Sequence, residues 1–519
     1  MKQPAPPPRT TARIAALLTT AALAGLAACG GERTPEAGGA PDAVTPDAVM
    51  AGLQPAVQLE GEPPATWTLD ERMAHYAVPG VSVAVMEGGE IVWAEAWGVA
   101  DGETGAVVTP ATLFQAASIS KPVAALAAMS VVEDGTLALD EPVNRYLTSW
   151  QVPDNGFTAD SAVTLRGLLS HTAGLTVWGF PGYRKDQPYA ADQAVASNVQ
   201  VLDGTGNTDP VRVYKVPGTS WQYSGGGYTV MEQMVEDVTG RPFHEVARDR
   251  VLAPAGMANS TYEQPLPEAR WSEAARAHGA DGTEIDGEWH SYPEQAAAGL
   301  WTTPTDLMAL ARHLLAVRGG QETDGVVSRE MLTTMLTAHR GDEDGFDDYG
   351  LGFGVGLQGG APTFGHGGSN AGFKAQWVVY PETGQGAAVM TNGDRGSALA
   401  AEILRAVSDA YGWPGHKPRV RAHEPVTAEQ ADAYTGRYAM EGRPSFEVTV
   451  RPGEAGTGVL LIDVPGQGTY TLHAAPDSAD TFFDASDGQT IAFERGTDGA
   501  VVAVRPGGPA RLVRVGTEG

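Results

Sequence analysis

A serine and a lysine one helical turn apart are the first residues of this sequence whose types and spacing could do chemistry. In the segment Phe-Gln-Ala-Ala-Ser-Ile-Ser-Lys, residues 114–121, two residues separate Ser118 from Lys121. If a helix begins at Ser118, the i and i+3 positions share one face, so the amine can meet the hydroxyl. A serine hydroxyl is a weak nucleophile until a base takes its proton, and a partly desolvated lysine can be that base. The pair predicts acyl transfer, although the same spacing also fits an ordinary capped surface helix.

Two later segments carry side chains that could work with such a nucleophile. Tyr223 opens the segment Tyr-Ser-Gly-Gly-Gly-Tyr, and a phenol or phenolate held near the lysine could relay a proton to the leaving group. His366 lies in the glycine-rich segment 364–373, where an imidazole could donate a hydrogen bond or act as a modest cation. Each has a simpler interpretation, because one of 15 tyrosines can be a core aromatic and a glycine-rich hairpin needs no chemistry.

Other kinds of chemistry lack their signatures in this sequence. We expect no metal, because no His-Glu-x-x-His or paired-cysteine spacing occurs. We expect no cofactor and no α/β-hydrolase lipase, because neither a nucleotide-binding glycine loop nor Gly-x-Ser-x-Gly is present. The net charge of −29 argues against a nucleic-acid partner, since affinity for a phosphate backbone is built from Lys and Arg. The expected partner is a small-molecule or peptide substrate.

A mixed α/β domain in residues 65–412 would position these side chains. Strand-like runs on either side of a glycine-containing turn occur twice, at 80–86 with 91–94 and at 375–380 with 387–391. Helical patterns occupy residues 118–133, 228–238, 243–252, 305–316 and 397–411. Strands at both ends with helices between them predict one sheet that the C-terminal part of the domain completes.

Residues 424–517 have a different pattern. Short β-type runs alternate with Gly- and Asp-rich turns at 446–450, 459–464, 469–472, 481–483, 490–493 and 501–504. Regular spacing of this kind predicts a small antiparallel barrel or sandwich. No catalytic constellation occurs in this part, so stabilisation is the preferred interpretation, with ligand binding or shaping of the cleft as alternatives.

The N-terminus has the organisation of a processing signal. Residues 1–28 combine a basic start with an apolar run too short to span a bilayer, which is typical of a signal peptide. Cys29 is the only cysteine and follows Leu-Ala-Ala, which resembles the box at which bacterial lipoproteins are cleaved and lipidated. The alternative is a stray cysteine in an ordinary secretory leader. Residues 29–64 have the composition of a flexible linker. We therefore expect an enzyme held in the bacterial cell envelope, outside the cytoplasm in the periplasm or at the cell surface, by lipid at Cys29 alone.

Segment 114–121 closely resembles the nucleophile motif of class C β-lactamases and the related serine β-lactamase-like hydrolases. That group includes low-molecular-weight penicillin-binding proteins, D-aminopeptidases and esterases. Residues 168–175, Leu-Leu-Ser-His-Thr-Ala-Gly-Leu, 223–228 and 364–373 resemble further motifs of the group in the same order. The resemblance covers residues 66–411. It implies an α/β fold with a β-lactamase/transpeptidase-like antiparallel sheet, flanking helices and a helical subdomain. Residues 424–517 look like the lipocalin-like barrel appended to many such hydrolases.

The resemblance also implies roles for particular residues. Ser118, Lys121 and Tyr223 fall on the catalytic positions, and His366, Gly368 and Ser369 fall on the strand that binds substrate and the oxyanion. The oxyanion hole would be formed by the backbone N–H groups of Ser118 and Ser369, and His171 would be a structural residue near the site.

The sequence departs from the family pattern at Gly225, where the family usually has Asn. The departure favours an esterase or D-amino-acid peptidase over a dedicated β-lactamase, and the form of the His366 strand points the same way. The alternative is a catalytically silent envelope lipoprotein that binds peptidoglycan fragments.

Overall fold

The structure is a computed structural model that describes residues 44–321, 326–339, 348–441, 443–454, 456–465, 468–506 and 510–515. The predicted signal peptide and Cys29 lie outside the described residues. No helix within these ranges is both long enough and apolar enough to span a bilayer.

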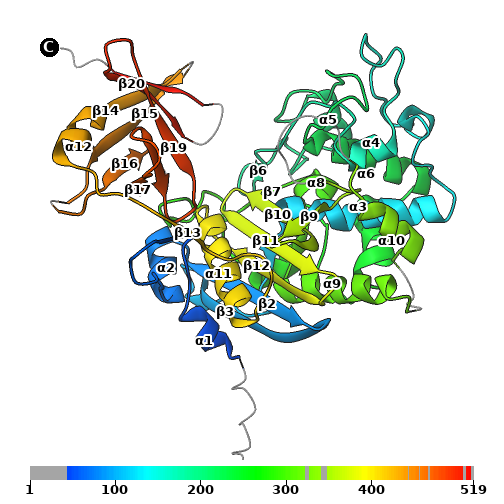
Figure 1. Ribbon diagram of the computed structural model, residues 1–519. Helices are drawn as coiled ribbons and strands as arrows, with labels where there is room; N and C mark the ends of the chain where they lie inside the picture. The colour runs from blue at the N-terminus through cyan, green and yellow to red at the C-terminus, as the bar shows by residue number, and fades with distance from the viewer. Residues whose placement is uncertain are drawn as a thin grey trace, which may run out of the picture. The chain divides into compact units, whose positions relative to one another are not determined.

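The catalytic part of the chain is built on one seven-stranded sheet in the order β4-β3-β2-β12-β11-β10-β9 (Figure 1). The strands are β2 (Gly80–Glu87), β3 (Glu90–Asp101), β4 (Ala106–Val107), β9 (Gly354–Gln358), β10 (Ala361–Asn370), β11 (Phe373–Tyr380) and β12 (Gln385–Thr391). Every neighbouring pair is antiparallel. At the centre, β2 pairs with β12, which confirms that the C-terminal part of the domain completes the sheet.

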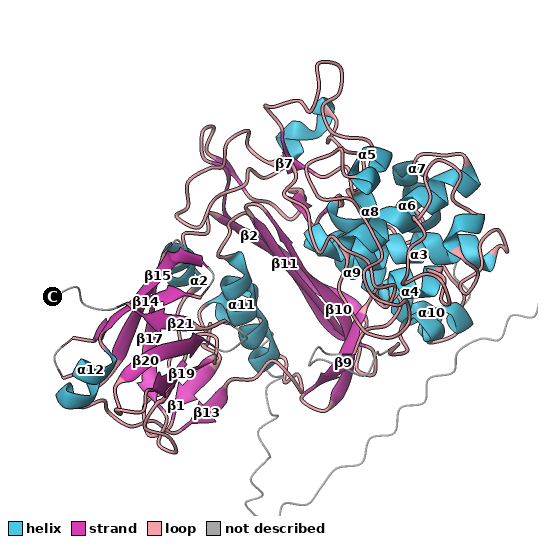
Figure 2. Cartoon of the chain, turned by 90° about the horizontal axis from the view of Figure 1, so that it is seen from above, coloured by secondary structure: helices cyan, strands magenta, loops and turns pink. Residues whose placement is uncertain are grey.

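Alternate residues of the central strands point to two separate apolar cores. On β2, Val81, Val83 and Val85 enter one core, whereas Ala84 and Met86 enter the other, as the two-residue period of a strand requires. Helices α2 (Leu69–Tyr76) and α11 (Gly396–Ala410) lie over the first face. Helices α3 (Ser120–Glu133) and α9 (Pro304–Arg318) lie over the second (Figure 2). Both faces of the sheet are therefore covered, which confirms the expected α/β fold class.

Most of the other helices and two short strand pairs gather on the α3 side of the sheet (Figure 2). The helices are α4 (Leu165–Leu169), α5 (Asn198–Asp203), α6 (Gly225–Thr239), α7 (Phe243–Ala247) with a π-helical turn at Arg248–Leu252, α8 (Gln295–Ala298) and α10 (Arg329–Met335). Two small strand pairs accompany them, β5 (Phe114–Gln115) with β8 (Trp301–Thr302) and β6 (Tyr183–Arg184) with β7 (His290–Ser291). Helix α6 begins three residues earlier than predicted, because the Ser224 hydroxyl accepts from the Gly227 N–H and caps a glycine run.

Residues 44–64 correct the prediction of a flexible linker that extends to residue 64. They contain α1 (Pro46–Met50) and β1 (Val57–Leu59), and β1 pairs in parallel with β13 (Arg419–Arg421). Val49, Met50 and Leu53 are buried in the same core as α11. The few apolar side chains in this Pro- and Gly-rich stretch are thus enough to order it once a preformed apolar surface receives them.

The C-terminal part is a closed antiparallel barrel in the order β14 to β21. Its elements are β14 (Gly436–Met440), β15 (Arg443–Pro452), β16 (Leu460–Val464), β17 (Gly468–Ala474), β18 (Thr481–Asp484), β19 (Thr490–Arg495), β20 (Val501–Pro506) and β21 (Leu512–Arg514), preceded by α12 (Ala428–Tyr434). Pairing of β14 with β21 closes the barrel, so the barrel prediction is confirmed and the sandwich alternative is wrong. Strands β14 and β21 were not predicted.

Candidate active site

Ser118 lies in a single 3₁₀ turn, Ala117–Ile119, between β5 and α3. The preceding residue, Ala117, is fully buried and has a φ of 49°. A non-glycine residue in this left-handed region is strained, and such strain persists only where the surroundings enforce it. The sequence predicted a helix that begins at Ser118. The structure instead begins α3 at Ser120, which leaves the nucleophile on a tight, strained turn.

Lys121 points its amine back at this turn. Its Nζ lies 3.0 Å from Ser118 Oγ and donates to the carbonyl oxygen of Ala297 at 2.8 Å. The residue is only 2% exposed, and burial lowers the pKa of the amine from 10.5 to about 7. Near neutral pH a large fraction of the amine is therefore uncharged and able to accept a proton. The i and i+3 spacing predicted this contact.

Tyr223 completes the group around the nucleophile. Its hydroxyl hydrogen-bonds with Ser118, and burial raises the pKa of the phenol well above 10. The Lys121 amine lies 4.9 Å from the centre of the tyrosine ring. Of the two forms expected from the sequence, the structure therefore favours the neutral phenol over the phenolate.

His171 packs against the ring of Tyr223. The two ring centres are 4.2 Å apart, and His171 Nδ1 accepts from the Ser224 N–H at 3.1 Å. Burial, followed by the Lys121 charge, lowers the pKa of this imidazole well below 6.5, so it is neutral. These contacts favour the structural role expected for His171, since it orients Tyr223 through packing and through the backbone next to it.

Of the two forms expected for His366, the structure favours the neutral hydrogen-bond donor over the modest cation, because burial lowers its pKa to about 4. Its Nδ1 lies 2.5 Å from the carbonyl oxygen of Gly367, so Nδ1 must carry the proton. Its Nε2 lies 3.1 Å from the Tyr349 hydroxyl, which also lies 3.3 Å from the Gly352 carbonyl oxygen. Tyr349 is a residue that sequence reasoning missed. One sequence feature could have indicated Tyr349. It stands directly before the alternating Gly-Leu-Gly-Phe-Gly segment, 350–354, which leads into β9.

Strand β10 brings His366, Gly368 and Ser369 against the nucleophile turn. Its first half pairs with β9, whereas residues 366–370 have β11 on one side and the nucleophile turn near the other. A Cβ on Gly368 would lie 2.2 Å from the Ala116 carbonyl oxygen, so only glycine permits this approach. Asn370 Nδ2 fastens the same stretch by donating to Gln115 Oε1 at 2.8 Å. The exposed Ser369 thereby lies close to the nucleophile, and its oxyanion role stays a prediction.

The loop between α4 and β6 places an indole at the edge of the site. Val177 has a φ of 65°, which is a strained value for a β-branched residue, and its carbonyl oxygen accepts from the Gly226 N–H at 3.0 Å. The next residue, Trp178, is 72% exposed, and its ring lies 6.1 Å from that of Tyr223. Phe180 fills the space beside Gly225, where a Cβ would lie 2.7 Å from its ring. The family's usual asparagine would therefore require Phe180 to move.

The chemistry of the site is that of an amine, hydroxyls and imidazoles. Among the residues that the structure describes, no three His, Cys, Asp or Glu side chains come together in a way that could hold a metal ion.

Comparison with known proteins agrees with this geometry. A model of the Beta-lactamase family matches residues 67–411. The chain belongs to the beta-lactamase family. This confirms the resemblance seen in the motifs.

Relatives within the beta-lactamase family differ in their names. Penicillin-binding protein 4 of Amycolatopsis lactamdurans is 28% identical over 348 residues, 65% of this chain and 86% of that protein. Esterase EstB of Burkholderia gladioli is 31% identical over 201 residues, 38% of this chain and 51% of that protein. D-aminopeptidase of Brucella anthropi is 26% identical over 402 residues, 76% of this chain and 71% of that protein. These relatives support hydrolase activity for this member of the family.

A solved structure shows the same fold. The octameric penicillin-binding protein homologue from Pyrococcus abyssi superposes with a TM-score of 0.58 at 23% identity. It covers 86% of this chain, and this chain covers 98% of it. The β-lactamase/transpeptidase-like fold is thereby confirmed.

The buried amine predicts the pH dependence of the beta-lactamase-family site. A lysine at this position would act as a base only when neutral, and the pKa of Lys121 is about 7. We expect kcat/KM for a nitrophenyl ester to rise about tenfold per pH unit below 7 and to level off above it. His366, with a pKa of about 4, adds no step in this range. Lys121→Arg, which stays protonated, should abolish the activity while circular dichroism shows a folded protein. A flat profile from pH 5.5 to 8.5 would contradict the role of Lys121.

Two neighbouring glycines of β10 offer a matched test of the close approach between this strand and the turn that carries Ser118. Gly368→Ala would place a methyl group 2.2 Å from the Ala116 carbonyl oxygen, whereas Gly367→Ala would meet the flexible Gln376 side chain at 3.3 Å. We expect Gly368→Ala to lower kcat/KM about 100-fold, because small misplacements of reacting groups are costly. Gly367→Ala should remain close to wild type. Equal activity of the two variants would show that the close approach does not matter.

Proposed function

We propose that this chain hydrolyses an ester or amide through an acyl-enzyme on Ser118. The observation that carries the proposal is the 3.0 Å separation between Ser118 Oγ and the Lys121 amine, whose pKa burial lowers to about 7. A base beside a serine, in a site that limits water, is the arrangement that nucleophilic catalysis requires.

In the first step, the neutral Lys121 amine takes the Ser118 proton as Oγ attacks the carbonyl carbon. A new O–C bond forms, and the carbonyl oxygen becomes an oxyanion that accepts from the backbone N–H groups of Ser118 and Ser369. The protonated Tyr223 hydroxyl, hydrogen-bonded to Ser118, passes a proton to the leaving group and regains one from Lys121. The bond to the leaving group breaks, and the acyl ester of Ser118 remains.

In the second step, water attacks the acyl ester. Lys121 takes one proton of the water, the bond between Ser118 Oγ and the acyl carbon breaks, and the proton returns to Oγ. The products are a carboxylic acid and free enzyme, so atoms and charges balance without a cofactor.

Esters and D-amino-acid amides or peptides are the proposed substrates, in preference to β-lactams. Position 225 is a glycine packed beside Phe180 and not the usual asparagine, which removes a donor for a substrate amide. His366 is neutral and its one N–H donates to Gly367, so it offers no fixed positive charge to a β-lactam carboxylate. The relatives named as an esterase and a D-aminopeptidase support the same choice.

The Ser118 nucleophile can be tested by covalent labelling. We expect a fluorophosphonate to add to Ser118, as mapped by mass spectrometry, and Ser118→Ala to remain unlabelled while unfolding at the wild-type temperature. Turnover of nitrophenyl esters and D-alanyl peptides should exceed turnover of a chromogenic cephalosporin. A folded protein that takes no label, turns over no substrate and still binds peptidoglycan fragments would instead establish the silent binding protein.

Trp178 predicts a preference for substrates with an apolar group. A largely exposed indole beside Tyr223 can stack on a phenyl ring, which is worth about 1 kcal/mol beyond the area it buries. We expect Trp178→Ala to lower the ratio of kcat/KM for phenyl-bearing over methyl-bearing esters about tenfold. One series varies the acyl side and another the alcohol side. A ratio unchanged in both series would contradict a contact between the indole and the substrate.

We also propose that Cys29 is lipidated and holds the enzyme in the bacterial cell envelope. The support is the Leu-Ala-Ala-Cys sequence after an apolar leader. We expect cells fed an alkyne-bearing fatty acid to label the wild-type chain, and the label to be absent from Cys29→Ser. The variant should leave the membrane fraction with its esterase activity intact. Label on Cys29→Ser, or a variant that stays in the membrane fraction, would contradict the anchor.

A further inference from the structure

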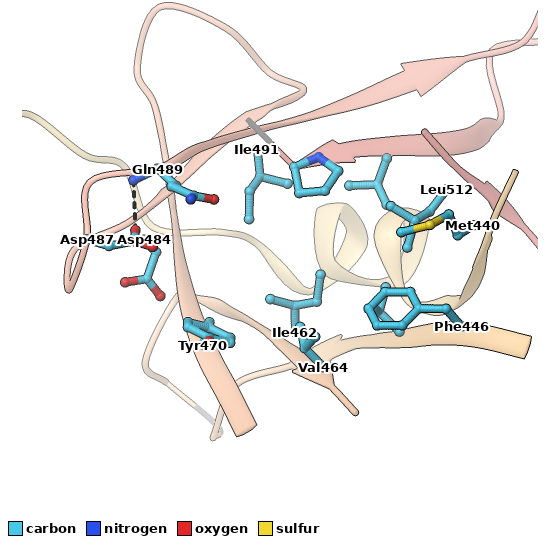
Figure 3. Close-up of a pocket in the computed structure, with 13 residues that line it drawn as sticks. Met440, Phe446, Ile462, Val464, Tyr470, Asp484, Asp487, Gln489, Ile491 and Leu512 are labelled. Carbon is cyan, nitrogen blue, oxygen red and sulfur yellow. Dashed lines mark hydrogen bonds between the residues drawn. The ribbon is translucent and has the colours of Figure 1, made fainter. Parts of the chain in front are cut away.

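The interior of the C-terminal barrel contains a cavity that the hydrolytic mechanism does not use. Its volume is about 240 Å³, and residues of the barrel strands and of the turn between β18 and β19 line it (Figure 3). An eight-stranded barrel is just wide enough to be filled by its own side chains or to hold one small ligand. A cavity of about 150 Å³ lined by aliphatic groups already admits benzene. The space in this barrel is larger and has room for a chain of about eight carbons.

The lining is chemically uneven. Most of it is apolar, from Met440 and Phe446 through Ile462 to Leu512. The polar side chains Asp484, Asp487 and Gln489 gather at one end, away from Met440 and Leu512 (Figure 3). The cavity is therefore amphipathic along its length, with an apolar body and one polar end.

The polar end carries negative charge. Asp484 is 4% exposed, and its carboxylate accepts from the Ser486 N–H at 2.6 Å and from the Ser486 hydroxyl. Asp487 is exposed, and Oδ1 accepts from the Gln489 N–H at 2.8 Å. Burial raises the pKa of the Asp484 carboxyl group, because neutral hydrogen bonds compensate the lost hydration only in part.

The residues that line the cavity include no Lys, Arg or His. Arg405, which acts electrostatically on Asp487, and Arg419, which lies beside Gly488, are close to the polar end but outside the lining. A guest with an anionic head would face two carboxylates at the polar end, whereas a cationic head would find complementary charge there. The charge of the lining therefore discriminates between amphiphiles of equal chain length.

We propose that the barrel binds one single-chain amphiphilic amine, with its alkyl chain among the apolar residues and its ammonium group beside Asp484 and Asp487. Burial of the chain supplies affinity in proportion to its apolar area. The carboxylates determine which head group is accepted. The site is independent of Ser118, and no bond is made or broken in it.

Isothermal titration calorimetry of the full-length protein with three eight-carbon probes tests the head group. We expect octylammonium to bind with a stoichiometry of one, octanol to bind about tenfold more weakly, and octanoate to bind most weakly. Octanoate binding as tightly as octylammonium would overturn the proposal, and so would the absence of octylammonium binding.

Two substitutions on one strand test the location. Ile462 points into the cavity, whereas the adjacent Leu461 points to the other face of β16, because successive side chains alternate. We expect Ile462→Phe to weaken octylammonium binding at least tenfold and Leu461→Phe to leave it unchanged. Equal effects of the two would place binding outside the barrel.

Two further substitutions test the charge. Asp484→Asn and Asp487→Asn should each weaken octylammonium binding severalfold and leave octanol binding unchanged. Asp487 lies at the exposed mouth, so Asp487→Asn remains informative if Asp484→Asn unfolds at a lower temperature. Ser118→Ala should bind octylammonium like wild type. Loss of binding in Ser118→Ala, or charge-neutral variants that bind octylammonium normally, would overturn the proposal.

Discussion

The burial of one amine is the constraint on which the rest of the catalytic part depends. A lysine that is 2% exposed is costly to keep charged, and its surroundings supply the Ala297 carbonyl oxygen and the Ser118 hydroxyl rather than a carboxylate. That choice of partners keeps the pKa near 7. A carboxylate at the same distance would have stabilised the ammonium and removed the base. The neutral partners around Lys121 are thus needed, together with its burial, to keep the pKa of the amine low.

Two strained backbone positions show how the surrounding elements support the buried amine. Ala117 is held in the left-handed region directly before the nucleophile, and Val177 is held there directly before the indole at the edge of the site. Each costs of order 1–3 kcal/mol. The contacts that enforce them are the approach of β10 at Gly368 and the N–H groups at the start of α6. The contacts of the sheet and of α6 therefore offset the cost of the strained backbone that positions side chains near Ser118.

The catalytic site and the barrel cavity use desolvation differently. In the catalytic site, burial lowers the pKa of Lys121 and His366, so that their uncharged forms are favoured. In the barrel, burial raises the pKa of Asp484 and leaves a carboxylate that a cationic guest would stabilise. The same principle, that low dielectric penalises charge, yields a proton acceptor in one place and a charge-selective end of a cavity in the other.

The sequence by itself indicated the family, because several motifs occur in the family's order, and it predicted that Ser118 and Lys121 meet, because a local spacing of three residues joins them. It also predicted the paired strands from the two ends of the domain's sequence, the helices between them and the barrel pattern, because side-chain periodicity and turn residues are local properties. Only the tertiary structure decided that Tyr349 meets His366 and that Phe180 occupies the space beside Gly225. It alone also decided that residues 44–64 are ordered. These outcomes depend on contacts between residues distant in sequence, and on burial that changes the charge of groups such as Lys121 and His366, which no local pattern records.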